Sequence, residues 1–156
     1  MATFEVIEIE PQPAAVVRAE LPTAELPSLF DRAFGAVMQV VAEQGLAITG
    51  PPFGYYPRMP GDTVAVAAGF PTSGPITASG EVTPLELPGG RAVRGVHLGP
   101  YDGLGQTYGE LMAWAQAQGL QLVEAGMWEA YVTDPSAEPD PSTWRTEITW
   151  PLAAGS

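Results

Sequence analysis

The second half of this chain repeats the pattern of the first half, and this duplication limits the possible folds more than any other feature. The same order of strand, strand, helix, strand, strand is predicted twice, over residues about 4–71 and again over about 80–152. Short matches recur in the same order in the two halves, with similar spacing. They are Ala15-Val16 with Ala92-Val93, Gly45-Leu46 with Gly119-Leu120, Phe53 with Trp128, Tyr56 with Tyr131, and Phe70-Pro71 with Trp150-Pro151. The matches predict two copies of one module, related by a pseudo-two-fold axis.

Apolar spacing between the prolines and glycines predicts the elements of each module. Short apolar or alternating runs predict strands at 4–10, 15–21, 53–56, 63–70, 82–87, 92–98, 127–133 and 143–150. Apolar residues three and four positions apart predict helices over about 27–44 and 104–118, which end at Gly45 and Gly119. The helices need a sheet face to cover them, and the short connections favour antiparallel pairing within each module. We expect an α+β fold: an antiparallel sheet with two helices on one face and a cleft between the repeats.

The composition is that of a single globular domain, which we place at residues 1–156. The chain has 18 acidic residues against 6 basic ones, so its formal charge is −12. Such a surface repels polyanions, and we expect no direct contact with nucleic acid. Because the chain has no cysteine and a single histidine, His97, thiolate sites and multi-histidine zinc sites are excluded. We therefore expect no metal and no cofactor.

The N-terminal segment and the hydropathy pattern predict a cytoplasmic protein. Residues 1–10 carry three glutamates and lack the cationic start of a signal peptide. No apolar stretch reaches the ~18–20 residues of a membrane span, so we expect no membrane contact. Edge strands of the sheet could pair across a homodimer, although prolines near the strand ends oppose that pairing.

The strand around Glu129 is the first candidate for a functional site. Its alternation places Trp128 and Ala130 on one face, and Glu129 with Tyr131 on the other. Glu129 is then either a solvated strand residue or a carboxyl at the bottom of an aromatic cleft. In the second case desolvation raises its pKa, and it can neutralise a cationic ligand or act as an acid or base.

Aromatic residues and a second carboxylate could complete that site. Tyr56 and Tyr131 occupy matching positions in the two modules, where they could line both walls of a cleft and attract a cation through their ring faces. Glu147 either faces the same region as Glu129 or pairs with its face-neighbour Arg145. The helical Tyr108 is interpreted as a core residue.

His97 stands where a predicted strand turns into the second helix. We interpret it as an orienting, hydrogen-bonded residue at the strand end and not as a catalyst.

Three segments of the second half carry a resemblance to a known family. They are His97-Leu98-Gly99-Pro100-Tyr101-Asp102-Gly103-Leu104, Trp128-Glu129-Ala130-Tyr131 with Asp134-Pro135, and Thr146-Glu147-Ile148-Thr149-Trp150-Pro151-Leu152. Together they resemble the GyrI-like small-molecule-binding domain, the effector-binding domain of AraC- and MerR-type multidrug regulators. The resemblance implies a tandem pseudo-two-fold fold and a pocket between the repeats for varied, often aromatic and cationic molecules. It places the pocket's central glutamate at Glu129.

Two functions follow from the resemblance, together with the residues above. The first is a stand-alone protein that senses or sequesters hydrophobic, aromatic, cationic small molecules. Its expected ligand-binding residues are Glu129, Tyr131, Tyr56, Phe53, Tyr101, Glu147 and Trp150. The alternative is a hydrolase of electrophilic, cyclopropane-bearing natural products, as in some stand-alone relatives of this family. In that case Glu129 and a tyrosine would be catalytic, with Tyr131 as our assignment and Tyr56 and Tyr101 as the other candidates.

A third function rests on charge alone. The acidic surface could mimic a polyanion toward a protein partner, which would make that interaction strongly dependent on salt.

Overall fold

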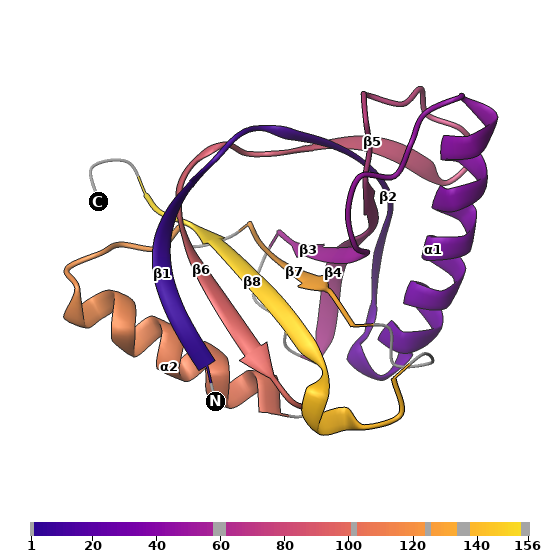
Figure 1. Ribbon diagram of the computed structural model, residues 1–156. Coiled ribbons are helices and arrows are strands. Elements are labelled where there is room, and N and C mark those ends of the chain that lie inside the picture. Colours follow the sequence, from indigo (N-terminus) through magenta and orange to yellow (C-terminus); the bar gives the residue numbers. More distant parts are fainter. Residues whose placement is uncertain (1, 58–61, 101–102, 124–125, 134–137, 154–156) are drawn as a thin grey trace.

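The expected order of elements is present in the computed structural model, which describes residues 2–57, 62–100, 103–123, 126–133 and 138–153 (Figure 1). The first half contains β1 (Ala2–Ile9), β2 (Gln12–Pro22), α1 (Leu26–Glu43), β3 (Phe53–Tyr56) and β4 (Thr63–Pro71). The second half contains β5 (Val82–Leu87), β6 (Gly90–Leu98), α2 (Leu104–Ala117), β7 (Met127–Tyr131) and β8 (Arg145–Pro151). The predicted α+β fold with two strand-strand-helix-strand-strand repeats is confirmed.

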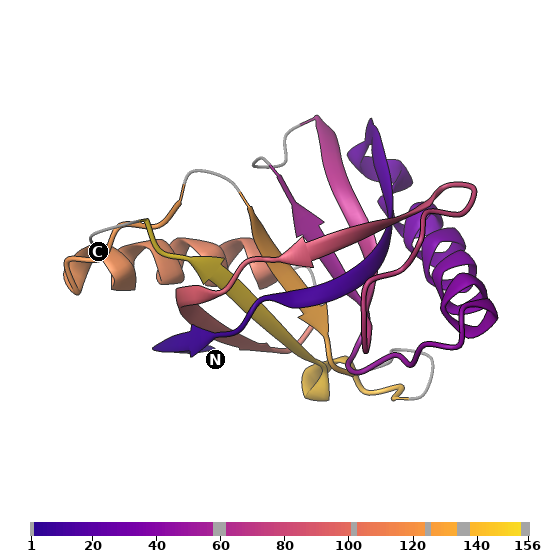
Figure 2. The same ribbon diagram turned by 90° about the horizontal axis from the view of Figure 1, so that it is seen from above.

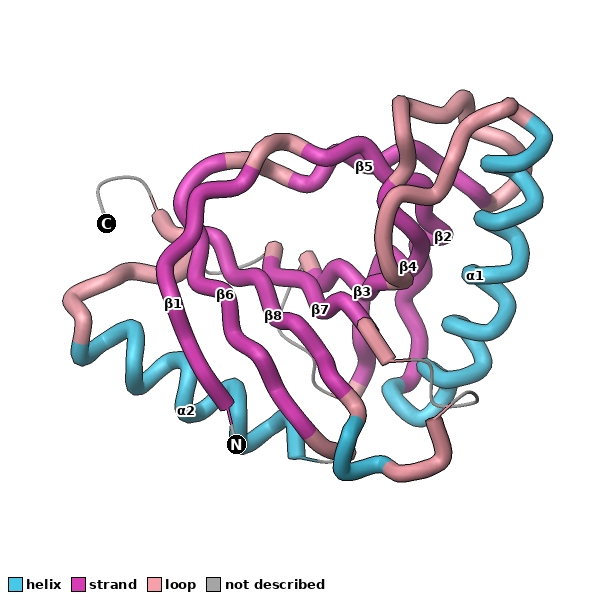
Figure 3. Tube along the Cα trace, in the orientation of Figure 1, coloured by secondary structure: helices cyan, strands magenta, loops and turns pink. Residues whose placement is uncertain are grey.

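The strands form one antiparallel sheet with the order β1-β6-β8-β7-β3-β4-β2-β5. Exchanging the two repeats reverses this order onto itself, so the pseudo-two-fold axis passes between β3 and β7. Figure 3 shows these two central strands side by side. The site predicted on β7 therefore lies at the boundary of the two repeats.

The pairing of the first strand differs from our expectation. Strand β1 pairs with β6 of the other repeat and not with β2, and β5 likewise pairs with β2. Only Glu10 and Pro11 separate β1 from β2. A two-residue hairpin turn needs positive φ angles that proline does not adopt, so the chain continues forward into the other half of the sheet.

The exchanged strands bind the two repeats together. The segment from β1 to β2 runs beside the segment from β5 to β6, and in Figure 1 both curve along the top of the molecule from one half of the sheet to the other. Where they cross, a Cβ on Gly89 would lie 2.6 Å from Cδ of Pro11. The close approach of the two segments thus requires glycine at this position.

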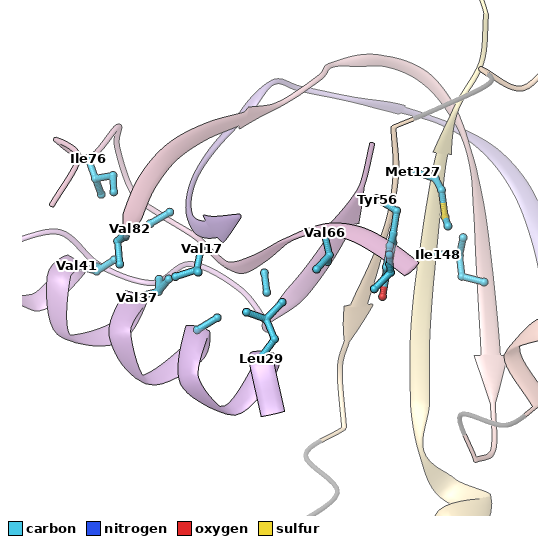
Figure 4. Close-up of a cluster of buried hydrophobic side chains, with 14 of the residues drawn as sticks. Val17, Leu29, Val37, Val41, Tyr56, Val66, Ile76, Val82, Met127 and Ile148 are labelled. Atoms are coloured by element: carbon cyan, nitrogen blue, oxygen red, sulfur yellow. The ribbon is translucent and has the colours of Figure 1, made fainter. Parts of the chain in front are cut away.

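Both helices cover the same face of the sheet, at its two ends (Figure 2). Helix α1 packs on β2, β4 and β5, and α2 packs on β1 and β6. Figure 4 shows Leu29, Val37 and Val41 of α1 pointing into the buried cluster. Each helix ends at a glycine with positive φ, 70° at Gly45 and 72° at Gly119. Within the described residues, no helix has the length and hydropathy needed to cross a membrane.

The opposite face of the sheet, which carries no helix, has its own apolar cluster. Its buried members are Ala14, Val16, Phe53, Ala67, Leu87 and Trp128. Val16 lies here, whereas Val93 lies in the helix-side cluster. The predicted match of Ala15-Val16 with Ala92-Val93 is therefore wrong by one residue, since a shift of one residue moves a side chain to the other face.

Candidate functional site

Strand β7 places Glu129 at the centre of the helix side of the sheet. Its register puts Glu129 between Gly54 of β3 and Ile148 of β8. The neighbouring Trp128 belongs to the cluster on the other face. The alternation predicted for this strand is confirmed, and Glu129 is 7% exposed.

Three tyrosines surround the carboxyl group of Glu129. The Tyr131 hydroxyl donates to Oε1 at 2.8 Å, and the Tyr108 hydroxyl donates to Oε2. The hydroxyls of Tyr56 and Tyr131 are 3.3 Å apart. The second repeat supplies Tyr131 on β7 and Tyr108 on α2, and the first repeat supplies Tyr56 on β3, so both repeats contribute to the site.

Burial dominates the electrostatics of this group. Desolvation raises the pKa of Glu129, and the hydrogen bonds from Tyr108 and Tyr131 and the charge of His97 only partly offset it. Desolvation likewise raises the phenol pKa of Tyr56, Tyr108 and Tyr131, with the Glu129 charge as the next cause. No ion pair to Glu129 is present in the described part of the chain. The site is a buried carboxyl that takes up a proton more readily than an exposed one.

Aromatic rings flank the carboxyl from both helices. Phe30 of α1 meets Tyr131 edge-on, with ring centroids 5.5 Å apart, and stacks on Phe34 at the same distance. On the α2 side Tyr108 meets Trp150 edge-on at 6.1 Å. A Cβ on Gly54 would lie 3.2 Å from both Phe30 Cζ and the Tyr131 hydroxyl. The glycine therefore lets Phe30 and Tyr131 approach the sheet closely.

His97 holds the end of β6 against the start of α2. Its Nε2 donates to the Pro100 carbonyl at 2.9 Å, and its Nδ1 lies 2.6 Å from Thr107 Oγ1. The ring is 6% exposed. The interpretation of His97 as an orienting residue agrees with these contacts, and through Thr107 it fixes the turn of α2 that carries Tyr108.

Two residues expected at the site lie on the opposite face of the sheet. Phe53 belongs to the helix-free cluster because its neighbour Gly54 occupies the position opposite Glu129. Glu147 pairs in register with Ala130 and so does not converge with Glu129. Its Oε2 accepts from Arg145 Nη2 at 2.8 Å and from Arg145 Nε at 3.2 Å. The ion-pair interpretation of Glu147 is the one that the structure supports.

The remaining expected residues fall into two groups. Tyr56, Tyr131 and Trp150 lie on the helix side with Glu129. Tyr101 lies outside the described residues.

The sequence prediction missed Tyr108, which it assigned to the core. Tyr108 follows Leu104 by four residues and precedes Leu111 by three, so it stands in the stripe that faces the sheet. A hydroxyl in a buried stripe needs a hydrogen-bond partner, and that requirement was the available signal.

The cleft expected beside Glu129 stays a prediction. Two surface hollows, of about 350 and 320 Å³, lie mainly on the helix-free side of the sheet, and Glu129 lines neither. Phe53, Trp128 and Arg94 line the larger one.

Comparisons with known proteins agree with this architecture. The structure superposes on the C-terminal domain of EcmrR with a TM-score of 0.75 and 23% identity, covering 98% of each chain. In an EcmrR–DNA complex the match has a TM-score of 0.79 and 23% identity and covers 97% of this chain, which spans 57% of the EcmrR chain. No curated protein matches the sequence.

More distant structures share the fold. A hydrolase encoded by lin2189 from Listeria innocua matches with a TM-score of 0.63 and 14% identity, over 97% of this chain and 92% of that one. SAV2435 bound to tetraphenylphosphonium matches with a TM-score of 0.67 and 11% identity, over 97% and 94%. The family model described as the GyrI-like small molecule binding domain matches residues 2–153. This chain therefore belongs to the GyrI-like small-molecule-binding domain family.

Proposed function

We propose that this protein binds hydrophobic aromatic cations on the helix side of the sheet, with Glu129 as their counter-charge. The observation that carries the proposal is the burial of Glu129 among phenols, without an ion pair in the described residues. A buried carboxylate is unfavourable unless a positive charge accompanies it. A lipophilic cation supplies that charge and keeps water out of the site.

The surrounding side chains suit such a ligand. Phe30, Tyr108 and Tyr131 are each partly exposed and offer ring faces or edges next to the carboxyl. Aromatic faces attract cations, most strongly where water is excluded. To reach Glu129, the ligand must displace one of the two tyrosine hydroxyls. We expect Tyr108 to move, because Tyr131 is also held by Tyr56.

Known structures of the same fold support the ligand class. The SAV2435 structure contains tetraphenylphosphonium, a permanently charged aromatic cation. EcmrR, whose structure is similar to this one, has been seen in a complex with DNA. By this proposal this chain contributes the ligand-binding function.

The test is a calorimetric titration with tetraphenylphosphonium and with neutral triphenylphosphine oxide. We expect the wild type to prefer the cation, and Glu129→Gln to weaken cation binding by about tenfold or more while sparing the neutral compound. The matched control is Glu147→Gln, which removes a carboxylate from the other face. Equal affinity for the two compounds, or an unchanged affinity in Glu129→Gln, contradicts the proposal.

The hydrogen bonds at Glu129 also support a second candidate, a hydrolase of strained electrophilic rings. In this reaction Glu129 takes a proton from water, the water oxygen attacks the ring carbon, and a tyrosine protonates the carbon whose bond breaks. The structure of a Listeria innocua hydrolase has the same fold. Because the pKa of Glu129 is raised, a larger fraction of this carboxyl is protonated in the empty site, and the protonated form cannot take a proton from water. We therefore place binding first.

Mass analysis distinguishes the two candidates. A cyclopropane-bearing electrophile incubated with the wild type should remain intact if the protein only binds it. A product heavier by one water, formed by the wild type and not by Glu129→Gln or Tyr131→Phe, would establish the hydrolase.

A further inference from the structure

The larger surface hollow lies on the opposite side of the sheet from Glu129. Its volume is about 350 Å³, which is within the range of small-molecule sites. Both repeats line it: Phe53 comes from β3, Leu87 from β5, and Trp128 with Ala130 from β7. Its floor is apolar and aromatic, because these residues belong to or pack against the helix-free cluster.

One cationic side chain, Arg94 of β6, also lines this hollow. Its Nε is buried and has no hydrogen-bond partner among the described residues. Buried donors in native proteins nearly always have an acceptor, so an unsatisfied N–H at a hollow calls for one from outside. The Nη1 of the same guanidinium lies 3.6 Å from Glu147 Oε1, beyond hydrogen-bonding distance.

The nearby carboxylates engage the guanidinium of Arg94 only in part. Glu147 already accepts two hydrogen bonds from Arg145. Two guanidinium groups therefore share one carboxylate. Glu5 is opposite Arg94 in the β1–β6 register, but it is exposed, and none of the ion pairs between described residues joins the two. Glu10 lines the hollow and is exposed to solvent, which screens its charge.

We propose that this hollow binds a small aromatic carboxylate. The ring lies against Phe53 and Trp128, and the carboxylate accepts hydrogen bonds from Arg94, including one from Nε–H. A planar guanidinium presents Nε–H and Nη–H in the fork that a carboxylate matches. The two faces of the sheet then select ligands of opposite charge, a cation at Glu129 and an anion at Arg94. This site does not depend on the function proposed for Glu129.

The first test uses 2-naphthoate and the neutral 2-naphthamide as probes in calorimetric titrations of the full chain. We expect the wild type to bind naphthoate at least about tenfold more tightly than the amide. Binding of naphthoate should persist in Glu129→Gln, which separates this site from the helix-side site. The absence of naphthoate binding, or equal binding of the two probes, overturns the proposal.

Variants then locate the site. Arg94→Lys keeps the charge and loses the Nε–H donor, so it should weaken naphthoate binding by about tenfold, whereas Arg32→Gln, an exposed arginine on α1, should not. Ala130→Leu adds apolar volume to the hollow, whose lining includes Ala130, and should weaken both probes. Thermal unfolding of each free variant establishes that it is folded. Unchanged naphthoate affinity in both folded Arg94→Lys and folded Ala130→Leu also overturns the proposal.

Discussion

The two repeats share an aromatic frame and differ in the polar atoms attached to it. In the first, Phe34 of α1 meets Phe70 of β4 edge-on at 5.4 Å. In the second, Tyr108 of α2 meets Trp150 of β8 edge-on at 6.1 Å. Corresponding elements of the two repeats hold these ring pairs, which indicates that the fold requires the aromatic rings. The hydroxyl of Tyr108 has a different role, because its partner Glu129 is present only in the second repeat.

The central strands show the same contrast. Gly54 of β3 and Glu129 of β7 are opposite one another across the pseudo-two-fold axis. Glycine makes room for Phe30 and Tyr131, and the glutamate carries the carboxyl that the tyrosines bind. A symmetrical fold thus builds an asymmetric site, with shape from one repeat and charge from the other.

Making the central strands alike should cause the largest loss. Gly54→Glu places a second carboxyl beside Glu129, and its Cβ lies 3.2 Å from the Phe30 ring. Overpacking and a second buried acid should together lower the free energy of unfolding by about 3 kcal/mol or more at pH 7. Urea denaturation measures the change. Gly54→Ala, which adds only the Cβ, should lose clearly less, and an equal loss in both variants would show that charge plays no part.

Exchanging the aromatic residues at the matching positions of α1 and α2 should change the free energy of unfolding less, and the two exchanges should differ in size. Tyr108→Phe gives α2 the side chain of Phe34 and removes one of the two hydrogen bonds to Glu129. We expect a loss of about 1–2 kcal/mol in unfolding free energy. The reciprocal Phe34→Tyr adds a hydroxyl away from any carboxyl and should change stability by about 0.5 kcal/mol or less. Equal effects of the two changes would contradict the assignment of Glu129 as the partner of Tyr108.

The pH dependence of stability should single out the second repeat. Burial raises the pKa of Glu129 above its ordinary value of 4.5, so the folded chain holds this proton more tightly than the unfolded chain does. The contribution of Glu129 is fully present below pH 4.5 and is lost as pH rises toward the folded pKa. Relative to Glu129→Gln, the wild type should therefore become less stable from pH 4.5 upward. Denaturation curves of both proteins across this range measure it, and a constant difference would mean that the pKa is not raised.

Local sequence patterns were enough to predict the helices and strands. The sequence-based predictions failed where the structure depends on contacts between distant parts of the chain. The repeat order, Gly45 and Gly119 as helix ends, and the faces of β7 all follow from spacing within about ten residues. The exchange of β1 and β5 between the repeats could not be predicted in this way, because the pairing partner of a strand depends on the path of the whole chain.

The site was predictable only where a single strand encodes it. Glu129 and Tyr131 share β7, so period two places them together. Tyr108 reaches Glu129 from a helix 21 residues earlier in the chain. For Glu147 the sequence left two possibilities, a side chain that faces the region of Glu129 or one that pairs with Arg145. The register of β8 against β7 decides between them.

The helix ends offer a control in which the two repeats should respond alike. Gly45 and Gly119 have φ angles of 70° and 72°, and a Cβ at either position would touch nothing within 4 Å. Substitution by alanine should therefore cost only the left-handed backbone conformation, about 1 kcal/mol in each case. Urea denaturation of the two single variants should give losses that agree within about 0.5 kcal/mol. A much larger loss at Gly119 would show that α2 is positioned by its C-terminal end as well as by His97.

The glycines inside the helices offer the smallest and sharpest comparison. Gly35 of α1 and Gly109 of α2 are exposed, and a Cβ on either would meet nothing within 4 Å. Alanine should stabilise each helix by about 0.5–1 kcal/mol, as seen in thermal or urea unfolding. Gly109 follows Tyr108, the residue that we expect to move when a cation reaches Glu129. If glycine there serves that motion, Gly109→Ala should weaken tetraphenylphosphonium binding while Gly35→Ala leaves it unchanged. Equal stabilisation with unchanged binding in both variants would contradict a role of Gly109 in that motion.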